Sequence, residues 1–525
     1  MAKSPYTEIG WPIGGVSLHS GYTHQDPGTC IDALNVRGYD PTTNALRGAQ
    51  RAGHSKYLDG QIGSSYVQCV DHIVTASAIA GASVRTIKAV AVSGGNVRTF
   101  TRGGTVNVPT NGTGALHATN PYIGSTVLLN KLYFADGSTF KYYDPATDTV
   151  SALVASAGSL PTDAGNYPRI VVTWRGRLVF SGISSDPQNW FMSRQFDATD
   201  WDYAVATTTA DAQMPVAGNS VEAGRMPDIV NCLIPYSDDL MLSLGDHSIW
   251  QFTNDPASGG QIDRVSDTVG GAFGMPWCKD AYGTVYFFGS RGGIYRIQPS
   301  AGGGAAPERI SSKKVDSALL DVDMSTNVIK MVWDDRFQTV MIYITPIAGG
   351  TTKHYAYDIR NDAFWPDQFT NELHNPVAVH LMDGDSPDDR VVLLGCRDGY
   401  IRFIDISNKL DDDSPVSSYV YFGPIQSATE RFRLKELRAV LGENSDQVAL
   451  EVFRSHSPES AFRQMNPLWG TTIGPGRSRA IRLMATGQAM YVRLRNKSPN
   501  TAWQYEALFA WLEGLEKAAG RALHK

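Results

Sequence analysis

The stretch Asp280–Gln298, DAYGTVYFFGSRGGIYRIQ, decides the fold of this chain. Its apolar run Val285–Phe288 meets a glycine-rich turn, Gly289–Gly293, and a second alternating run follows at Ile294–Ile297. Two short apolar runs joined by such a turn predict a β-hairpin. We therefore expect two paired antiparallel strands here.

The same pattern recurs along the chain in different residues. Counting the hairpin that starts at Val285, seven copies are present, and the other six begin at Ala89, Leu132, Leu178, Leu240, Val340 and Val391. Successive copies start 43 to 62 residues apart, and a propeller blade has a period of about 40 to 50 residues. Each copy follows another short apolar run, and several precede a weaker polar run. We therefore predict a β-propeller of six or seven blades over residues 66–407, in which the weak outer strand of each blade faces water.

A parallel α/β fold is the main competitor for a chain with so many apolar runs. It would require an amphipathic helix between successive strands. The connections here are GSRGG, AGGGAAP, GDSPDD and DPASGGQ, whose glycine and proline content is typical of turns. The sequence therefore predicts an all-β protein.

The regions that flank the repeats differ from them in composition. Residues 1–65 are rich in turn residues and predict an extended segment that lies along the repeats or reaches a neighbouring subunit, with a disordered leader as the alternative. Residues 408–414 are acidic and predict a linker or an insertion at a blade edge. Five alternating runs in residues 415–513 predict a β-sandwich. In the last run we expect one face to carry Trp503, Tyr505, Ala507, Phe509 and Trp511. Residues 514–525 are expected to be a tail, either a short helix or a frayed end.

The bulk composition narrows the function classes. The 525 residues carry a formal net charge of −6, so no basic footprint for tight nucleic-acid binding is present. The wall of a channel through which DNA must slide is better neutral or acidic in charge. The first residues lack an apolar run of signal-peptide length, and we expect synthesis in a cytoplasm. The five cysteines are scattered, which argues against a disulfide framework and a structural zinc site: Cys30, Cys69, Cys232, Cys278 and Cys396.

Acidic and aromatic residues offer the candidate binding sites. One acidic cluster could ligate calcium, but it lacks EF-hand spacing and is better interpreted as a solvated hairpin tip: Asp383, Asp385, Asp388 and Asp389. We interpret Asp411–Asp413 as a soluble linker. Six tryptophans within the repeats could stack on sugar rings, although packing between blades is the favoured interpretation: Trp190, Trp201, Trp250, Trp277, Trp333 and Trp365.

Linear signatures of catalysis are missing from the sequence. It contains no GxSxG, HExxH, CxxC or phosphate-binding loop. A glycosidase with paired carboxylates leaves no linear signature and stays an alternative. We therefore predict no enzyme activity, no catalytic residue, no metal site and no cofactor.

Arginines concentrate in the C-terminal region, at Arg431, Arg433, Arg438, Arg477, Arg479, Arg482, Arg493 and Arg495. Stacking aromatics are not interleaved with them, as a nucleic-acid surface would require. An interface with a protein partner is the favoured interpretation.

Two stretches carry a resemblance to a known family. PGTCIDALNVRGYDPTTNALRGAQRAG, residues 27–53, is similar to the opening of phage tail and head-to-tail proteins. RGRLVFSGISSDPQNWFMSRQFDATDWDY, residues 175–203, resembles a blade of the same proteins. The family is that of the tail nozzle, or packaged-DNA-stabilising hub, proteins of short-tailed bacteriophages, and the resemblance covers roughly residues 27–407.

The resemblance implies a structural virion protein. Identical subunits, six in the expected ring, would lie below the portal and adaptor proteins, next to tail fibre or spike and needle proteins. The propellers would form the wall of a tube that retains and then releases double-stranded DNA without sequence-specific binding, and no cofactor or membrane anchor is implied. The alternative is a carbohydrate-binding or carbohydrate-cleaving propeller that contacts the host surface. A WD-type scaffold is disfavoured because the paired GH and WD phrases are missing.

Overall fold

The computed structural model describes residues 6–79, 82–204, 211–299, 306–426, 431–498 and 500–514, and these are built almost entirely of β-strands. The prediction of an all-β protein is confirmed. In the described residues the α-helices are one five-residue turn each, α1 (Asp316–Leu320) and α2 (Pro458–Phe462). The 3-10 turns are η1 (Pro256–Ser258), η2 (Glu372–His374) and η3 (Pro387–Asp389). None of the described helices is long and apolar enough to cross a membrane.

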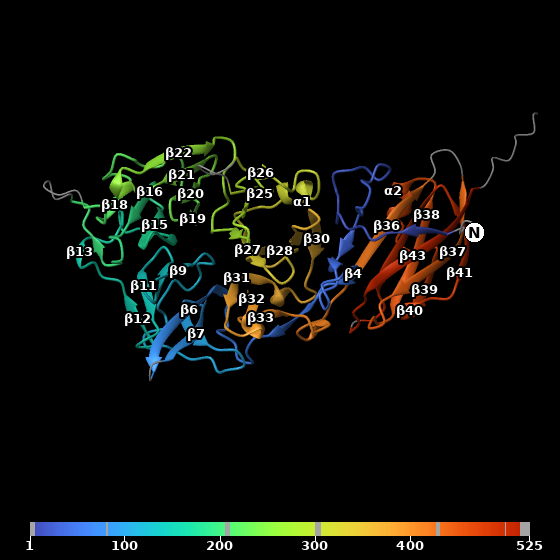
Figure 1. The fold of residues 1–525 in the computed structure, drawn as a ribbon, viewed down its shortest axis with the longest axis horizontal. Helices are drawn as coiled ribbons and strands as arrows, with labels where there is room; N and C mark the ends of the chain where they lie inside the picture. The colour runs from blue at the N-terminus through green and yellow to red at the C-terminus, as the bar shows by residue number, and fades with distance from the viewer. Residues whose placement is uncertain are drawn as a thin grey trace, which may run out of the picture.

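The molecule is elongated, with a ring of small sheets at one end and two larger sheets at the other (Figure 1). The small antiparallel sheets follow one another along the chain. Their strands are β6–β8 (Val67–Ile79, Ala82–Ser93, Asn96–Phe100), β9–β12 (Gly124–Leu128, Lys131–Ala135, Phe140–Asp144, Thr149–Ala152), β14–β16 with β18 (Ile170–Trp174, Arg177–Ile183, Asp186–Met192, Val216–Ala217), β19–β22 (Cys232–Ser237, Leu240–Leu244, Ile249–Thr253, Gln261–Ser266), β23–β26 (Trp277–Lys279, Val285–Phe288, Ile294–Ile297, Glu308–Arg309), β27–β30 (Asn327–Asp334, Thr339–Pro346, His354–Asp358, Ala363–Asp367) and β31–β33 (Pro376–Asp383, Arg390–Cys396, Ile401–Asp405).

The predicted strand positions are confirmed in these sheets. Each of the seven predicted hairpin starts lies on the second strand of one sheet, and the preceding apolar run forms the first strand. Most second strands are buried along nearly their whole length because neighbouring sheets cover both of their faces. All five residues of β20 are buried, whereas β22 at the outer edge of the same sheet is largely exposed or half-buried.

The hairpin predicted at residues 280–298 is confirmed in register. Val285 pairs with Ile297 and Phe288 with Ile294. The turn requires left-handed backbone at Gly292 and Gly293, with φ of 83° and 88°. Glycine adopts this conformation without a steric penalty from Cβ, so the GSRGG sequence matches the turn.

The sheets form a closed ring. Their apolar faces share core clusters with the next sheet, and β31 of the last sheet packs beside β6 of the first. The outer position of the last sheet is filled by an N-terminal strand, β5 (Gly53–Lys56), which pairs antiparallel with β33. The short strands β34 (Leu410–Asp411) and β35 (Ser414–Pro415) extend the same sheet. Strands from both flanking regions thus complete the ring.

Two sequence-based boundaries need correction at this point. The expected division at residue 65 cuts through the last sheet, because residues 53–56 are hydrogen-bonded to β33. The expected linker 408–414 contributes β34, and Asp411 within it is fully buried. Composition suggested solvent exposure, but ion pairing with a buried arginine stabilises this carboxylate in the interior.

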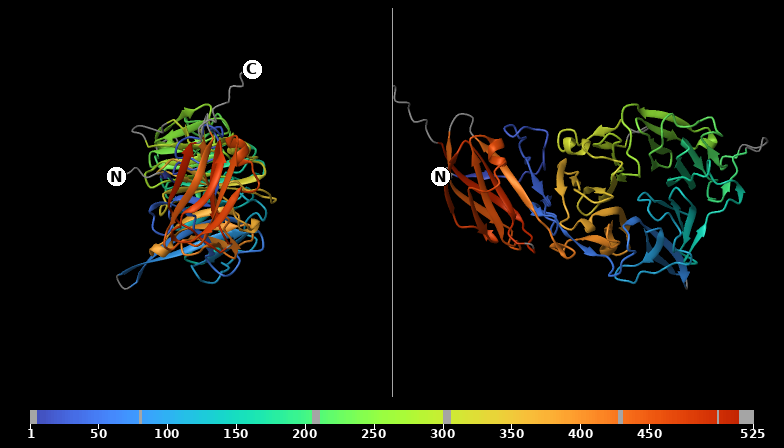
Figure 2. Two further views of the ribbon diagram at one scale, coloured as in Figure 1. Left: turned by 90° about the vertical axis from the view of Figure 1, so that its right-hand side faces the viewer. Right: turned by 180° about the vertical axis from the view of Figure 1, so that it is seen from behind.

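The larger sheets have five strands each and face one another across one apolar core (Figure 2). One contains β1 (Tyr6–Ile9), β43 (Tyr505–Gly514), β37 (Phe432–Leu441), β40 (Gly476–Arg477) and β41 (Ile481–Gly487). The other contains β2 (Ala33–Leu34), β36 (Tyr419–Gln426), β42 (Ala489–Asn496), β38 (Val448–Ser455) and β39 (Trp469–Ile473). Separate strand pairs are β3 (Val36–Tyr39) with β4 (Leu46–Gln50), and β13 (Ala157–Gly158) with β17 (Asp200–Trp201).

The predicted face of β43 is wrong beyond its first residue. Tyr505 is buried, but the next buried side chains are Leu508 and Ala510. Trp511 lies on the opposite face, with its ring centroid 6.0 Å from that of Tyr6. A register shift opposite Tyr505 moves the strand by one residue, which exchanges its faces. The tail after residue 514 lies outside the described residues.

Candidate functional sites: a central cavity and a buried junction

A cavity of about 380 Å³ occupies the centre of the ring. It is lined mainly by residues on or next to the first strands of the sheets, among them Asp71, Tyr122, Arg169, Trp277, Lys330 and His380. First strands lie closest to the axis, so their side chains converge there from sheets far apart in sequence. The volume is that of a small-molecule site.

One part of the cavity combines an aromatic pair with the half-buried Lys330. The rings of Tyr122 and Phe273 meet edge to face at 5.4 Å. Lys330 donates from Nζ to the Gly274 carbonyl at 2.9 Å and lies 5.8 Å from the centre of the Tyr122 ring. Burial lowers the pKa of Lys330. This side offers ring faces and a hydrogen-bond donor to a ligand.

An acid and an imidazole, Asp71 and His380, also line the cavity, and a second imidazole, His72, contacts His380. His72 Nδ1 and His380 Nε2 lie 2.6 Å apart, and Asp71 Oδ1 lies 3.6 Å from His380 Nε2. Ser125 donates its hydroxyl to Asp71 Oδ2 at 2.7 Å. Burial lowers the pKa of His380, so its imidazole is neutral at neutral pH. One nitrogen or oxygen of each of Asp71, His72 and His380 lies within 4.8 Å of the other two.

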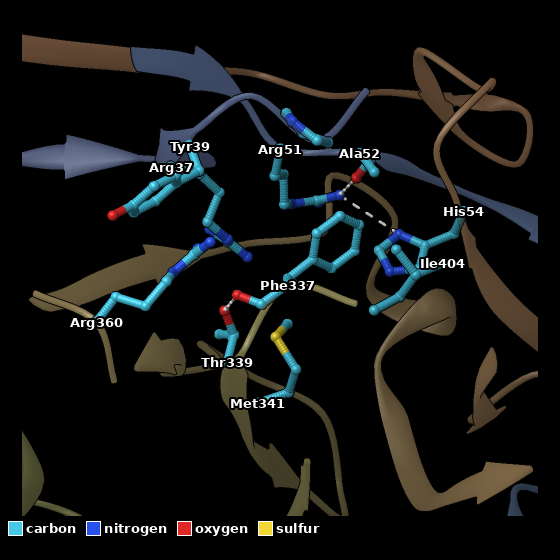
Figure 3. Close-up of a pocket in the computed structure, with 11 residues that line it drawn as sticks. Arg37, Tyr39, Arg51, Ala52, His54, Phe337, Thr339, Met341, Arg360 and Ile404 are labelled. Atoms are coloured by element: carbon cyan, nitrogen blue, oxygen red, sulfur yellow. Dashed lines mark hydrogen bonds between the residues drawn. The ribbon is translucent and has the colours of Figure 1, made fainter. Parts of the chain in front are cut away.

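A second site is the buried junction between the N-terminal segment and the last sheet (Figure 3). Arg51 donates through Nη1 and Nη2 to the two carboxylate oxygens of Asp411 at 2.8 and 2.7 Å. His54 Nδ1 lies 2.7 Å from Asp411 Oδ1, and because an ionised carboxylate can only accept hydrogen bonds, this nitrogen donates to it. Burial alone would raise the pKa of Asp411, but the charge and hydrogen bonds of Arg51 and His54 outweigh it and hold that pKa well below its usual range.

Two further arginines face the same pocket, and both already have carboxylate partners. Arg37 donates to the two oxygens of Asp367 at 2.8 and 2.6 Å. Arg360 donates to Asp358 at 2.7 Å and stacks on the ring of Tyr39 at 3.4 Å. The space between these side chains is about 30 Å³, enough for one or two waters. The junction is therefore a structural joint that holds N-terminal residues against the ring.

No protein-family model matches the sequence, and no curated protein matches it. Among solved structures, the chain is similar to three crystal structures from B. thetaiotaomicron. Two are named as extracellular domains of hybrid two-component systems, with 11% and 8% identity, TM-scores of 0.39 and 0.40, and coverage of 81% and 83% of this chain and 47% and 50% of theirs. The third is named as the extracellular domain of a one-component system, with 9% identity, a TM-score of 0.42, and coverage of 87% of this chain and 59% of that one. The chain spans about half the length of these structures.

The two predicted acidic sites differ in their burial and in their ion pairs. The cluster around Asp383–Asp389 lies at the exposed turn between β31 and β32, where Asp385 pairs with Arg85 at 2.8 Å and Asp389 lies 3.8 Å from Arg102. In the second acidic run, Asp411 is buried in the junction, contrary to its predicted role in solubility. Asp412 lies 3.0 Å from Arg402, and only Asp413 is exposed.

The tryptophans lie mostly in the interior, as expected for packing between sheets. Trp190, Trp201 and Trp365 have no exposed surface, and Trp333 is buried. Trp250 and Trp277 are half-buried, and of these Trp277 lines the central cavity.

The C-terminal arginines do not form one exposed face. Arg493 and Arg495 both pair with the buried Glu451, at 2.6 and 2.9 Å, and Arg438 pairs with Glu436. The exposed members are Arg431, Arg477, Arg479 and Arg482. The interface with a protein partner stays a prediction, and only this smaller set offers it exposed arginines.

Sequence reasoning missed the residues that the fold brings together. His72 and His380 are polar residues within apolar first strands, VQCVDHIV in the first repeat and NPVAVHL in the last. A polar residue that interrupts an apolar strand was the signal in the sequence that could have identified these two histidines. Arg177 is fully buried within the second family-like stretch and donates to Asp255 and to the Met214 carbonyl, at 3.1 and 2.7 Å. Its position after an expected turn gave no sign of burial.

Proposed function

We propose that this chain is a structural, non-enzymatic subunit of the tail nozzle of a short-tailed phage. The observation that carries the proposal is the position of residues 27–53, the stretch that resembles the nozzle family. These residues supply β2, β3, β4 and Arg51, and β5 begins at their end. They join one of the five-stranded sheets to the last sheet of the ring. The family-like stretch therefore ties the two parts together through strand pairing, as a wall subunit requires.

The finer fold belongs to the same proposal. We interpret the ring as a seven-bladed propeller, with β5 completing the last blade, and the five-stranded sheets as a β-sandwich. The one-to-one match between the predicted hairpins and the second strands supports seven blades. The shared apolar core and the alternation along β37 support the sandwich.

The size of the central cavity decides where DNA would pass. A major groove of duplex DNA alone is about 12 Å wide, and a cavity of about 380 Å³ cannot admit a duplex. A DNA channel would therefore lie between copies of the chain arranged in a ring, for which we propose six. A net charge of −6 suits a wall that DNA slides past. Portal, adaptor, tail fibre or spike and needle proteins are the proposed partners in the virion.

Native mass spectrometry and negative-stain microscopy test this proposal. The full chain would be measured alone and after mixing with purified tail components of its source virion. We expect a hexameric ring, either spontaneously or on an adaptor complex. A monomer that ignores these components at micromolar concentration would overturn the nozzle function.

A specific observation favours a carbohydrate reader as the second candidate. Tyr122, Phe273 and Trp277 converge with Asp71 in one cavity of small-molecule size, and aromatic faces beside a carboxylate suit a sugar. Host-surface polysaccharide would be titrated against the full chain and against Trp277→Ala, with Trp250→Ala as the matched control outside this cavity. Saccharide binding lost only in Trp277→Ala, together with a persistent monomer, would replace the nozzle proposal with this one.

A further inference from the structure

The seam where the ring closes has an unusual set of side chains. β6 begins the first sheet and β31 begins the last, so these strands are neighbours only because the ring closes. The core of the contact between these two sheets is apolar, built from residues such as Val70, Ala378 and Met382. His72 and His380 interrupt this apolar contact, and His380 also lines the central cavity.

The two imidazoles face one another through nitrogen atoms. His72 Nδ1 and His380 Nε2 are 2.6 Å apart, and their ring centres are 4.9 Å apart. One of these nitrogens must carry a proton for the contact to be attractive. Imidazole nitrogens are also the commonest protein ligands for transition metals, and here two of them are directed at one point.

Asp71 supplies a third ligand atom to the same point. Neighbouring residues of a strand point to opposite faces, so Asp71 would ordinarily face away from His72. The backbone N–H of His72, however, donates to Asp71 Oδ1 at 2.7 Å, which turns the carboxylate back towards the imidazole. Oδ1 then lies 3.6 Å from His380 Nε2, and Ser125 holds the other oxygen at 2.7 Å.

The spacing fits a small divalent ion after a minor movement. Ligands bound to zinc at about 2.0–2.2 Å in a tetrahedron lie about 3.4 Å from one another. The nitrogen–oxygen pair is already at 3.6 Å, and the two nitrogens would have to separate by less than about 1 Å. In the described residues, no lysine or arginine lies within 4.0 Å of the Asp71 carboxylate, so its charge is available to a cation. The cavity beside Asp71 and His380 leaves room for a water as the fourth ligand.

We propose that Asp71, His72 and His380 bind one zinc ion, or a similar borderline divalent ion, that clasps the first sheet of the ring to the last. Two imidazole nitrogens and one carboxylate oxygen match the ligand preference of zinc and disfavour magnesium and calcium, which take oxygen ligands. The ion would add a second closure beside the hydrogen bonds of β5.

Metal titration of the full chain tests this proposed zinc site. Protein treated with EDTA and dialysed would be titrated with Zn²⁺ by calorimetry and with Co²⁺ by visible spectroscopy. We expect one equivalent of Zn²⁺, the intense d–d bands of a four-coordinate Co²⁺ site, and a higher Tm with Zn²⁺ than with EDTA. His380→Ala and His72→Ala should each weaken binding at least 100-fold, and Ser125→Ala about 10-fold because it only orients Asp71.

His247→Ala is the matched control. His247 is exposed and lies 3.3 Å from Asp246 and 3.6 Å from Asp228. The substitution therefore removes a histidine near carboxylates without changing the seam. Its affinity for Zn²⁺ should equal that of the unmodified chain. Binding weaker than 100 μM in the unmodified chain, or binding that His247→Ala abolishes and His380→Ala leaves intact, would overturn the proposal. If the histidine variants do not fold, the Co²⁺ spectrum of the unmodified chain decides: octahedral or absent bands count against the site.

Discussion

Removing Arg51 should destabilise the chain strongly, because it leaves a buried carboxylate without its cation. Asp411 has no exposed surface and Arg51 only 5%, and the two share hydrogen bonds of 2.8 and 2.7 Å. In Arg51→Met the volume is roughly kept, but His54 is left as the nearest donor to Asp411. Breaking a buried ion pair from one side costs about 3 to 5 kcal/mol. Urea unfolding followed by tryptophan fluorescence should show a loss of this size.

A double-mutant cycle separates the ion pair from simple packing. Replacing both partners, as Arg51→Met with Asp411→Leu, removes the buried charge and should recover at least half of the loss caused by Arg51→Met. Arg463→Ala is the control, because its pair with Glu459 at 2.7 Å is 69% and 52% exposed and should matter by less than about 0.5 kcal/mol. A loss below about 1 kcal/mol for Arg51→Met, or losses in the double variant that simply add, would refute the reasoning.

Three other substitutions or conditions test the joint and the ring. Gly53→Ala should lower the free energy of unfolding by more than about 2 kcal/mol in urea, because a Cβ there would lie 2.0 Å from the Leu410 carbonyl oxygen. An unchanged urea midpoint would contradict the pairing of β5. Gly48→Ala should lower the free energy of unfolding by about 1 to 3 kcal/mol in calorimetry. The new Cβ would lie 1.9 Å from the ring of Trp11, which packs against Trp503 and Tyr505. An unchanged stability would show that Trp11 lies elsewhere. Acid should destabilise the chain through His354, whose Nδ1 accepts from the Ile344 N–H and whose Nε2 donates to Asn375. Burial lowers the pKa of His354 to about 4, below about 6.5 in the unfolded chain. Its contribution, about 3 kcal/mol, is therefore present above pH 6.5 and lost as pH falls towards 4. Urea midpoints between pH 7.5 and 4 should be flatter for His354→Gln, and parallel curves would exclude this histidine.

The hairpin pattern in the sequence predicted the ring well because the strands of each sheet are close together in the chain. Val285–Phe288 and its six counterparts lie on second strands as expected, since hairpin pairing depends on residues about ten positions apart. The N-terminal strands could not be placed in this way. Val420 pairs with Ala33, and Phe403 with Ser55, across more than 340 residues, and no periodicity within either segment specifies its partner.

The two candidate sites failed to appear in the sequence for the same physical reason. Asp411 stands in an acidic run that suggests solvent, and only its distance to Arg51 explains its burial. His72 and His380 are 308 positions apart and meet only because the ring closes. A polar residue inside an apolar strand can mark such a point, but its chemistry depends on the partner that closure brings.

Closure also explains why the N-terminal segment and the ring form one mechanical unit. The last sheet would end at β33 without β5, and its outer edge would expose unpaired backbone groups. β5 follows β4 and Arg51 directly, so one continuous segment supplies the strand that completes the ring, the arginine of the buried ion pair and the connection to β2. A force that separates the two parts must therefore break the sheet pairing of β5 and the Arg51–Asp411 pair together. A wall subunit under the pressure of a packaged genome would need this coupling, whereas a free ligand-binding propeller would not.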